Sequence, residues 1–230
     1  MSGYGHVPTG QYRCWSVRQM MTKATEIITK TRDGRSTREA ILEAASRLIH
    51  VHGYNHTSLD DVLRDSGVGK GNFYYHFKSK EELGYAILDQ IIASFLERTL
   101  EPCFADPEGR ALTQIRCFLD RVLEAQRERN CVGGCPLGNL ASELSDVHEG
   151  FRARLACVFA AWRERLTLAL RTAQLRGAVD GACRPGAVAD FLVASLEGAI
   201  LLTKLTKDIT VMEQCVAEMK RYLSLFEPRA

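Results

Sequence analysis

The run SLDDVLRDSGVGKGNFYYHFKSKEEL, residues 58–83, decides how this chain folds. Ser58 is a suitable N-cap, and Asp60 and Asp61 follow it in the first turn, where the helix dipole favours negative charge. Gly67 can adopt the left-handed backbone conformation that a sharp turn between helices requires. These signals predict a helix over 58–65, a turn over 66–68, a second helix over 69–77 and the start of a third helix at Ser79.

The second of these helices has two unlike faces. Phe73 and Phe77 are four residues apart and share one face, which we assign to the core. The other face carries polar and aromatic side chains, namely Lys70, Asn72, Tyr74, Tyr75 and His76. Lysine and asparagine can reach base edges and phenols can donate to phosphate oxygens, so this face suits a groove of DNA. The two helices and their glycine turn are typical of a helix-turn-helix.

The motif T-S-L-D-D-V-L-x-x-S-G-V-G-K-G-N-F-Y-Y-H-F-K-S-K-E-E-L resembles the DNA-binding signature of the TetR family of bacterial repressors. The resemblance extends from Arg38 to Leu83. It implies an all-α homodimer with an N-terminal three-helix DNA-binding domain. It also implies a larger C-terminal domain that binds a small ligand and dimerises.

We expect the DNA contacts to come from the second helix and its flanks. Lys70, Gly71 and Asn72 are expected to approach bases or adjacent phosphates. Thr57 and Ser58 are well placed to donate to a phosphate, and the family resemblance places Lys80 at the DNA backbone. The expected backbone contacts are completed by Tyr74, Tyr75 and His76.

Charge is distributed unevenly along the 230 residues, whose net charge is +2. Residues 1–80 hold 12 Lys and Arg against 7 Asp and Glu, whereas the remainder holds 18 against 21. The positive excess therefore coincides with the predicted DNA-reading helix, as a phosphate-contacting module requires. No apolar run approaches the roughly 18 residues that span a bilayer, and the N-terminus lacks a signal-peptide core, so we expect a cytoplasmic protein without membrane contact.

Three segments and about nine helices are predicted in all. Residues 1–36 show no hydrophobic periodicity and are expected to form a flexible basic tail. Residues 37–83 form the helix-turn-helix domain, beginning with a helix over 37–53, and residues 84–230 form the ligand-binding and dimerisation domain. The helix that starts at Ser79 is expected to run to about Leu100 and to stop before Pro102. It joins the two domains and is the natural transmitter between them.

The C-terminal domain is predicted to be wholly helical. Its expected helices cover 111–129, 135–144, 147–176, 186–205 and 209–225, separated by turns rich in glycine and proline. The last two are apolar and adjacent, which suits a four-helix interface between two copies of the chain. We therefore expect a homodimer through the last two helices.

The stretch G-C-x-x-G-N-L-x-x-E, residues 134–143, resembles a TetR subgroup that senses acrylate-type acids, quinones, aldehydes or oxidants. In part of that subgroup, a cysteine matching Cys135 is the reactive sensor. Cys135 begins a predicted helix, whose N-terminus stabilises the thiolate, and Cys131 could resolve an oxidised Cys135 to a disulfide. The alternative is that Cys135 is a buried apolar cysteine that lines a pocket. The other cysteines are expected to be reduced.

A pocket that binds its effector without covalent chemistry is the competing hypothesis. Such pockets are mostly apolar with a few polar anchors. The polar or aromatic residues expected to face the space between the helices are Phe118, Asn139, Glu143, Trp162, Glu197 and Lys204. Each has an ordinary alternative as a core, surface or interface residue.

Other function classes find little support in the sequence. No Ser/His/Asp set or metal quartet is present, and G-V-G-K-G-N lacks the spacing of a phosphate-binding loop, so we expect neither an enzyme nor a metal or cofactor site. A helical adaptor that has lost DNA binding is a further alternative, which the intact basic reading helix opposes. We therefore predict a repressor that binds double-stranded operator DNA and is released by a small-molecule effector. The sequence does not separate a repressor from an activator.

Overall fold

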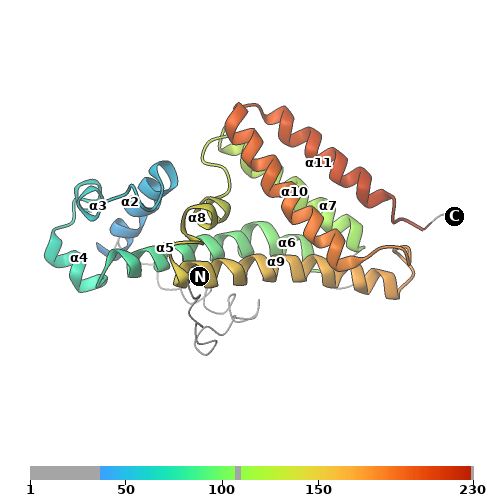
Figure 1. The fold of residues 1–230 in the computed structure, drawn as a ribbon, viewed down its shortest axis with the longest axis horizontal. Coiled ribbons are helices and arrows are strands. Elements are labelled where there is room, and N and C mark those ends of the chain that lie inside the picture. The colour runs from blue at the N-terminus through green and yellow to red at the C-terminus, as the bar shows by residue number, and fades with distance from the viewer. Residues whose placement is uncertain (1–36, 107–109, 229–230) are drawn as a thin grey trace, which may run out of the picture.

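The computed structural model describes residues 37–106 and 110–228, and the predicted tail over 1–36 lies outside these ranges. Within them, the chain is built from helices and turns (Figure 1), which confirms the all-α fold class. The α-helices are α2 Thr37–His52, α3 Leu59–Ser66, α4 Lys70–His76, α5 Lys80–Phe95, α6 Glu101–Phe104, α7 Ala111–Glu128, α8 Pro136–Leu144, α9 Glu149–Leu175, α10 Pro185–Thr206 and α11 Ile209–Ser224.

Helices α2, α3 and α4 pack around Phe73 and Phe77, which belong to a hydrophobic core that continues through α5 into the C-terminal helices. Phe73 and Phe77 are 0% and 2% exposed, and their ring centroids are 5.8 Å apart, as predicted from their spacing. Gly53 ends α2 with φ +88° and Gly67 ends α3 with φ +68°. Both glycines hold the left-handed conformation that a side chain would disfavour. Helices α2 and α3 therefore end where the sequence predicts.

Side-chain caps fix the starts of α3 and α5. The Ser58 hydroxyl accepts from the Asp61 N–H at 3.1 Å, and the Asp61 carboxylate accepts from the Ser58 N–H at 3.1 Å, which completes a capping box. Ser79 accepts from the Glu82 N–H at 3.1 Å, as predicted. The Glu82 carboxylate, however, accepts from the N–H of Lys78 at 2.8 Å, one residue before the cap.

The predicted break at Pro102 is wrong. The chain remains helical from Lys80 to Phe104, because a π-helical turn over Leu96–Leu100 joins α5 to α6. Pro102 then lies in the first turn of α6, and the carbonyl of Arg98 in the turn before it accepts from Arg121 Nη1 at 2.9 Å. If α5, the π-turn and α6 are counted as one rod, the described part of the chain has nine helices. This rod lies beside α9 along the length of the molecule (Figure 1).

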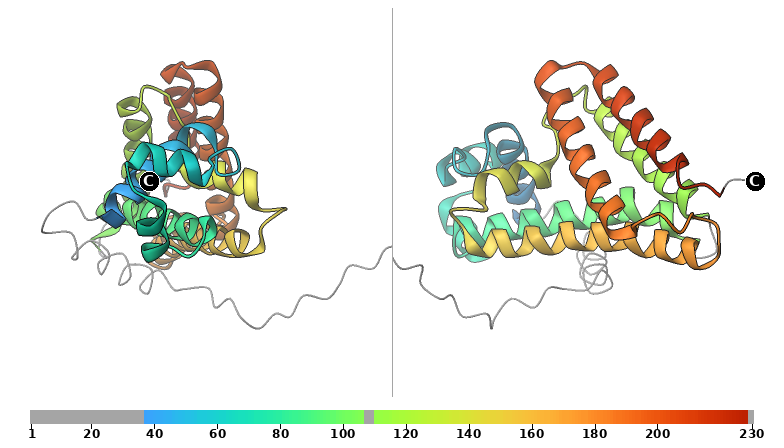
Figure 2. Two further views of the ribbon diagram at one scale, coloured as in Figure 1. Left: turned by 90° about the vertical axis from the view of Figure 1, so that its left-hand side faces the viewer. Right: turned by 45° about the vertical axis from the view of Figure 1, so that its right-hand side comes forward.

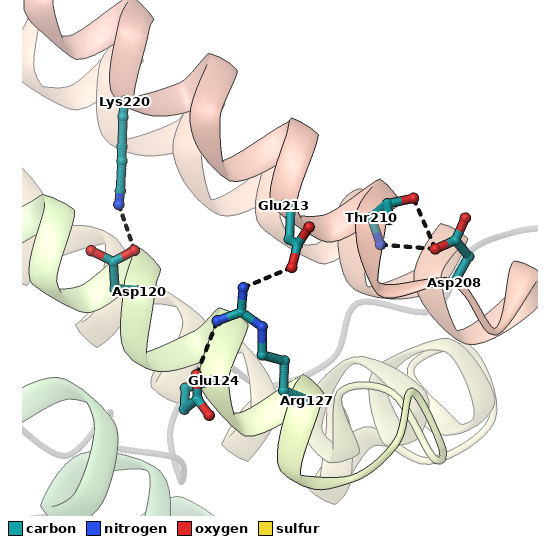
Figure 3. A network of polar contacts seen from close by, with 7 residues as sticks. All are labelled: Asp120, Glu124, Arg127, Asp208, Thr210, Glu213 and Lys220. Atoms are coloured by element: carbon teal, nitrogen blue, oxygen red, sulfur yellow. Dashed lines mark hydrogen bonds and ion pairs between the residues drawn. The ribbon is translucent and has the colours of Figure 1, made fainter.

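Helices α7, α9, α10 and α11 form the C-terminal bundle. Polar bridges tie α11 to α7 (Figure 3), where Arg127 bonds Glu213 at 2.7 Å and Glu124 at 3.1 Å. Lys220 pairs with Asp120 about two turns further along the two helices. A disulfide joins Cys103 of α6 to Cys117 of α7, so the expectation of reduced cysteines is wrong for this pair.

Helix α10 carries apolar residues on two faces. One face is buried and includes Leu192, Leu196 and Ile200. The other face is exposed at Phe191, Leu201, Leu202 and Leu205, with exposed fractions of 47%, 62%, 49% and 76%. By length and composition α10 could cross a membrane, although only 39% of its apolar window is buried here. The core helix of a soluble protein meets the same criterion, so the expectation of no membrane contact stays a prediction.

Candidate functional site

The outer face of α4 is open to solvent. Tyr75 is 85% exposed and Tyr74 48% exposed, while Lys70 and Asn72 are also exposed. A Cβ at Gly71 would meet no atom within 4 Å. The His76 ring is half-buried and makes an edge-on contact with Tyr75, with centroids 5.0 Å apart. Phe73 holds this face in place from behind, so the structure brings the predicted α4 residues together on one surface.

The flanking residues predicted to contact phosphate serve the protein itself. Thr57 is 2% exposed, and its hydroxyl donates to the carbonyl of Gly53 at 2.8 Å. The predicted phosphate contact from Thr57 is therefore wrong, because its only side-chain donor is already used. The Ser58 hydroxyl is exposed but donates to Asp61 at 2.5 Å.

Lys80 lies against the protein, with its Nζ 4.4 Å from the centroid of the Tyr54 ring. Burial lowers the pKa of Lys80, although the carboxylate of Glu143 opposes that shift. Burial, followed by the charges of Glu81 and Glu143, raises the pKa of Tyr54 to about 12, so this phenol stays neutral. In this conformation Lys80 therefore stabilises the turn after α2 and presents less of its charge to DNA.

A cavity of about 610 Å³ lies among α5, α7, α8, α9 and α10. Three residues of the predicted effector set, Cys135, Trp162 and Glu197, line it. Phe118 and Cys131 are not among its lining residues. Phe118 is 1% exposed and packs behind Trp162, with centroids 5.4 Å apart, and Cys131 is 5% exposed in a left-handed turn. Phe118 therefore supports the cavity wall from behind, and the expected role of Cys131 in resolving an oxidised Cys135 stays a prediction.

Two polar atoms at this cavity have no hydrogen-bond partner in the described structure. They are Nε1 of Trp162, on a side chain only 3% exposed, and Oε1 of Glu197. Buried polar groups are nearly always paired, so each such atom calls for an explanation. Burial raises the pKa of Glu197, opposed by a hydrogen bond with Cys135. The cavity wall thus holds an unpaired indole N–H donor and an unpaired carboxyl oxygen.

Cys135 is the N-cap of α8, as predicted, and its Sγ accepts from the Gly138 N–H at 3.3 Å. Burial and then the adjacent Glu197 carboxylate raise the pKa of the Cys135 thiol to about 12. This direction is opposite to the one expected from a helix N-terminus alone, because burial outweighs the helix dipole. The cysteine is therefore a protonated thiol at neutral pH.

The other predicted effector residues lie along α8 and beside it. Asn139 donates from Nδ2 to the carbonyl of Gly133 at 2.6 Å and accepts from Lys204 Nζ at 3.2 Å. Both residues line a second hollow of about 340 Å³, together with Cys135 and Glu197. Glu143 points elsewhere, because its carboxylate accepts from the backbone N–H groups of Tyr54 and Asn55. Glu143 also lines a separate hollow of about 510 Å³ beside His50, so its contact with an effector stays a prediction.

Sequence reasoning missed several polar residues that line the large cavity. Arg98, Arg121 and Arg129 reach it from the π-turn and from α7, and Gln126 is 3% exposed. Gln126 occupies a core-facing position of an apolar helix, and that polar interruption was the available signal. The sequence held no such signal for the three arginines, because their positions resemble an ordinary solvated helix face.

Two family models match the chain. Residues 41–87 match "Bacterial regulatory proteins, tetR family", and residues 111–219 match "Tetracyclin repressor-like, C-terminal domain". An uncharacterized HTH-type transcriptional regulator of Lactococcus lactis subsp. lactis is 34% identical over 179 residues, covering 78% of this chain and 89% of that protein. The HTH-type transcriptional repressor NemR of Escherichia coli K12 is 26% identical over 188 residues, covering 82% and 94%.

A solved structure shares both the fold and part of the sequence. The TetR transcriptional regulator from Chloroflexus aurantiacus J-10-FL superposes with a TM-score of 0.77 at 28% identity. The match covers 91% of this chain and 100% of that one, so it includes both the α2–α4 unit and the C-terminal bundle.

Proposed function

Because this chain belongs to the TetR family of bacterial regulatory proteins, we propose that it represses transcription and is released from its operator by a small-molecule effector. Its family makes it a helix-turn-helix transcriptional regulator, and its relatives carry the names of regulators rather than enzymes. The observation that carries the proposal is the α4 face, which exposes a lysine, an amide and two phenols that a core would not accept. We place this activity in the cytoplasm and assign it no cofactor.

A homodimer would place two copies of α4 in neighbouring major grooves of a pseudo-palindromic operator. Lys70 and Asn72 would then approach base edges, with Gly71 permitting close approach, while Tyr74 and Tyr75 donate to phosphates. We retain residues 37–83 as the DNA-binding unit and 84–230 as the ligand-binding and dimerisation unit.

The exposed stripe on α10 supports a dimer interface there. Four large apolar side chains face solvent on this helix, and the small residues Ala194 and Gly198 lie between them. Small residues let a partner helix approach closely, and burying the apolar side chains stabilises the pair by the hydrophobic effect. Helix α11 packs beside α10 through Phe191 and Tyr222, with centroids 4.8 Å apart, so both of the last two helices can contribute.

We assign the effector to the 610 Å³ cavity. A ligand with a hydrogen-bond acceptor near Trp162 Nε1 and a donor near Glu197 would satisfy both unpaired atoms. Since the raised pKa keeps the Cys135 thiol protonated, this arrangement favours binding without a covalent bond. A cysteine switch is the second candidate, favoured by the position of Cys135 on the cavity wall beside a carboxylate that can accept its proton.

Selection of bound fragments from sheared genomic DNA, followed by gel-shift titration, tests the DNA-binding part. We expect nanomolar binding to fragments near promoters, weakened by salt; binding that is equal for all fragments would contradict the proposal. Acrylate, methylglyoxal and 1,4-benzoquinone then serve as probe effectors. If the probes still release the Cys135→Ser variant from DNA, the result supports the cavity alone. If they no longer release it, the result supports the cysteine switch.

The sign of regulation needs its own measurement, because an activator would share every feature described here. A reporter placed behind the selected promoter is compared with and without the regulator. We expect expression to rise when the regulator is absent, and a fall would identify an activator.

A further inference from the structure

Helix α8 extends from the effector cavity to the DNA-binding unit. Its N-cap Cys135 and its first residues, Pro136 and Leu137, line the 610 Å³ cavity. Glu143 lies near the opposite end, eight residues after Cys135, which is about 12 Å along a helix axis. Helix α8 packs on α9 and α5, at the end of the bundle nearest α2 (Figure 2). One short rigid element therefore touches both regions.

The Glu143 carboxylate holds the turn that joins α2 to α3. Its Oε2 accepts from the Tyr54 N–H at 2.9 Å and its Oε1 accepts from the Asn55 N–H at 2.6 Å. These are charge-assisted bonds to two successive amides, so they fix both the position and the direction of the turn. Tyr54 is itself buried at 7% exposure, and the turn leads directly into the Ser58 cap of α3.

A second contact joins the same helix to α2. Gly133, in the loop before α8, lies against the ring of His50, and a Cβ at this glycine would overlap His50 Nε2. Asn139 of α8 holds this loop through the carbonyl of Gly133. Burial lowers the pKa of His50, followed by the nearby charges of Arg129 and Lys204. Helix α8 and the loop before it therefore contact the end of α2 and the turn that follows it at two points.

We propose that Glu143 is the positioning residue that couples effector occupancy to DNA binding, through its paired bonds with the amides of Tyr54 and Asn55. The inference rests on the proposed function and names the route by which it is regulated. An effector that shifts the cavity end of α8 withdraws the carboxylate from the two amides. The turn then loses its anchor, and α3 and α4 change orientation relative to the bundle. The effector drives this change because it binds the released state more tightly.

Linkage is reciprocal, so the coupling can be measured without knowing the effector. Trp162 lines the cavity and serves as the reporter, in a Trp15→Phe background that removes the only other tryptophan. Its fluorescence is recorded while operator DNA, chosen by the selection described above, is added to saturation. Glu143→Ala removes both bonds, and Glu143→Gln keeps the shape but replaces one acceptor with an N–H₂ group. Glu149→Gln is the matched control, because Glu149 pairs with Arg152 on its own helix at 2.5 Å.

We expect saturating operator to shift Trp162 emission in the parent protein and in Glu149→Gln, but not in either Glu143 variant. Operator affinity should fall about tenfold in Glu143→Ala, as charge-assisted bonds of this kind suggest. Amide exchange at Tyr54 and Asn55 should rise in both Glu143 variants while the melting temperature of the C-terminal bundle stays unchanged.

Two outcomes would overturn this inference while leaving the proposed function intact. One is a parent protein that binds operator without any change at Trp162. The other is a Glu143→Gln variant that binds and reports as the parent does, with unaltered exchange at Tyr54. Failure of the parent to bind any selected fragment would instead refute the proposed function itself.

Discussion

Helices α4 and α8 are both short, with seven and nine residues, and both carry polar side chains that we assign to function. They obtain that function in different ways. The polar face of α4 is backed by Phe73 of the same helix and faces solvent, where we propose that it meets DNA. The polar groups of α8 instead meet residues far away in the chain, such as Tyr54 and Lys204. The face of α4 is therefore a local property of the sequence, whereas α8 acquires its role only in the folded chain.

Removing the support behind α4 should have the largest effect. Phe73 is fully buried, so Phe73→Ala should cost about 3–5 kcal/mol of unfolding free energy, from lost burial and the cavity left behind. Urea denaturation followed by circular dichroism measures this loss. Tyr75→Ala is the control, because Tyr75 is 85% exposed and its removal should change stability very little. Equal losses for the two variants would mean that the two faces of α4 have been assigned the wrong way round.

Changing the outer face should affect binding rather than stability. Lys70→Ala should weaken operator binding by about 1–3 kcal/mol if the lysine reaches a base, and should reduce the salt dependence by about one charge if it reaches a phosphate. Fluorescence anisotropy at several salt concentrations separates these cases. Lys220→Ala is a matched control, since Lys220 pairs with Asp120 between α11 and α7. Unchanged affinity in Lys70→Ala at physiological salt would remove Lys70 from the interface.

The cap of α3 should have a smaller effect. Ser58→Ala breaks the capping box with Asp61 and should cost about 1 kcal/mol of unfolding free energy. Ser142→Ala, on α8, is the comparison, because its hydroxyl bonds only the carbonyl of Gly138 within its own helix. Thermal unfolding of both variants measures the difference. If Ser142→Ala costs more than Ser58→Ala, the cap does not anchor the helix-turn-helix.

The smallest effect is expected at Cys135. Since burial and Glu197 raise the pKa of its thiol to about 12, alkylation by iodoacetamide should be slow at pH 7 and accelerate as the pH rises toward that value. Glu197→Gln removes the negative charge and should lower this pKa, so the rate at pH 8 should rise several-fold. Mass spectrometry of the Cys135 peptide gives the rate. Rapid alkylation of the unaltered protein at pH 7 would instead indicate a reactive thiolate.

Much of the fold could be predicted because its signals are local. Caps, left-handed glycines and apolar stripes set the bounds of α2, α3 and α7 to within a residue or two. The continuation of helical structure past Pro102 could not be predicted, because it depends on a π-turn that places the proline in the first turn of α6. The disulfide between Cys103 and Cys117 was missed for a related reason, since it needs α6 and α7 to be brought side by side.

In the candidate site, too, the local features could be predicted from the sequence and the features that depend on distant contacts could not. The exposed residues of α4 were predictable from a face too polar for a core. Glu143 was expected at an effector pocket, because no feature of its own helix indicates the amides of Tyr54 and Asn55. The pKa of Cys135 was expected to fall, because the helix N-terminus is visible in the sequence whereas the approach of Glu197, 62 positions later, is not.

Hydroxyl-radical footprinting on a selected operator tests the central claim most directly, because it maps where a pair of α4 helices lies on the DNA. The account predicts two protected patches on one face of the duplex, separated by about one helical turn or a multiple of it, and both weakened together in Lys70→Ala. A single protected patch, or two patches that Lys70→Ala leaves unchanged, would contradict a dimer that reads DNA with the outer face of α4.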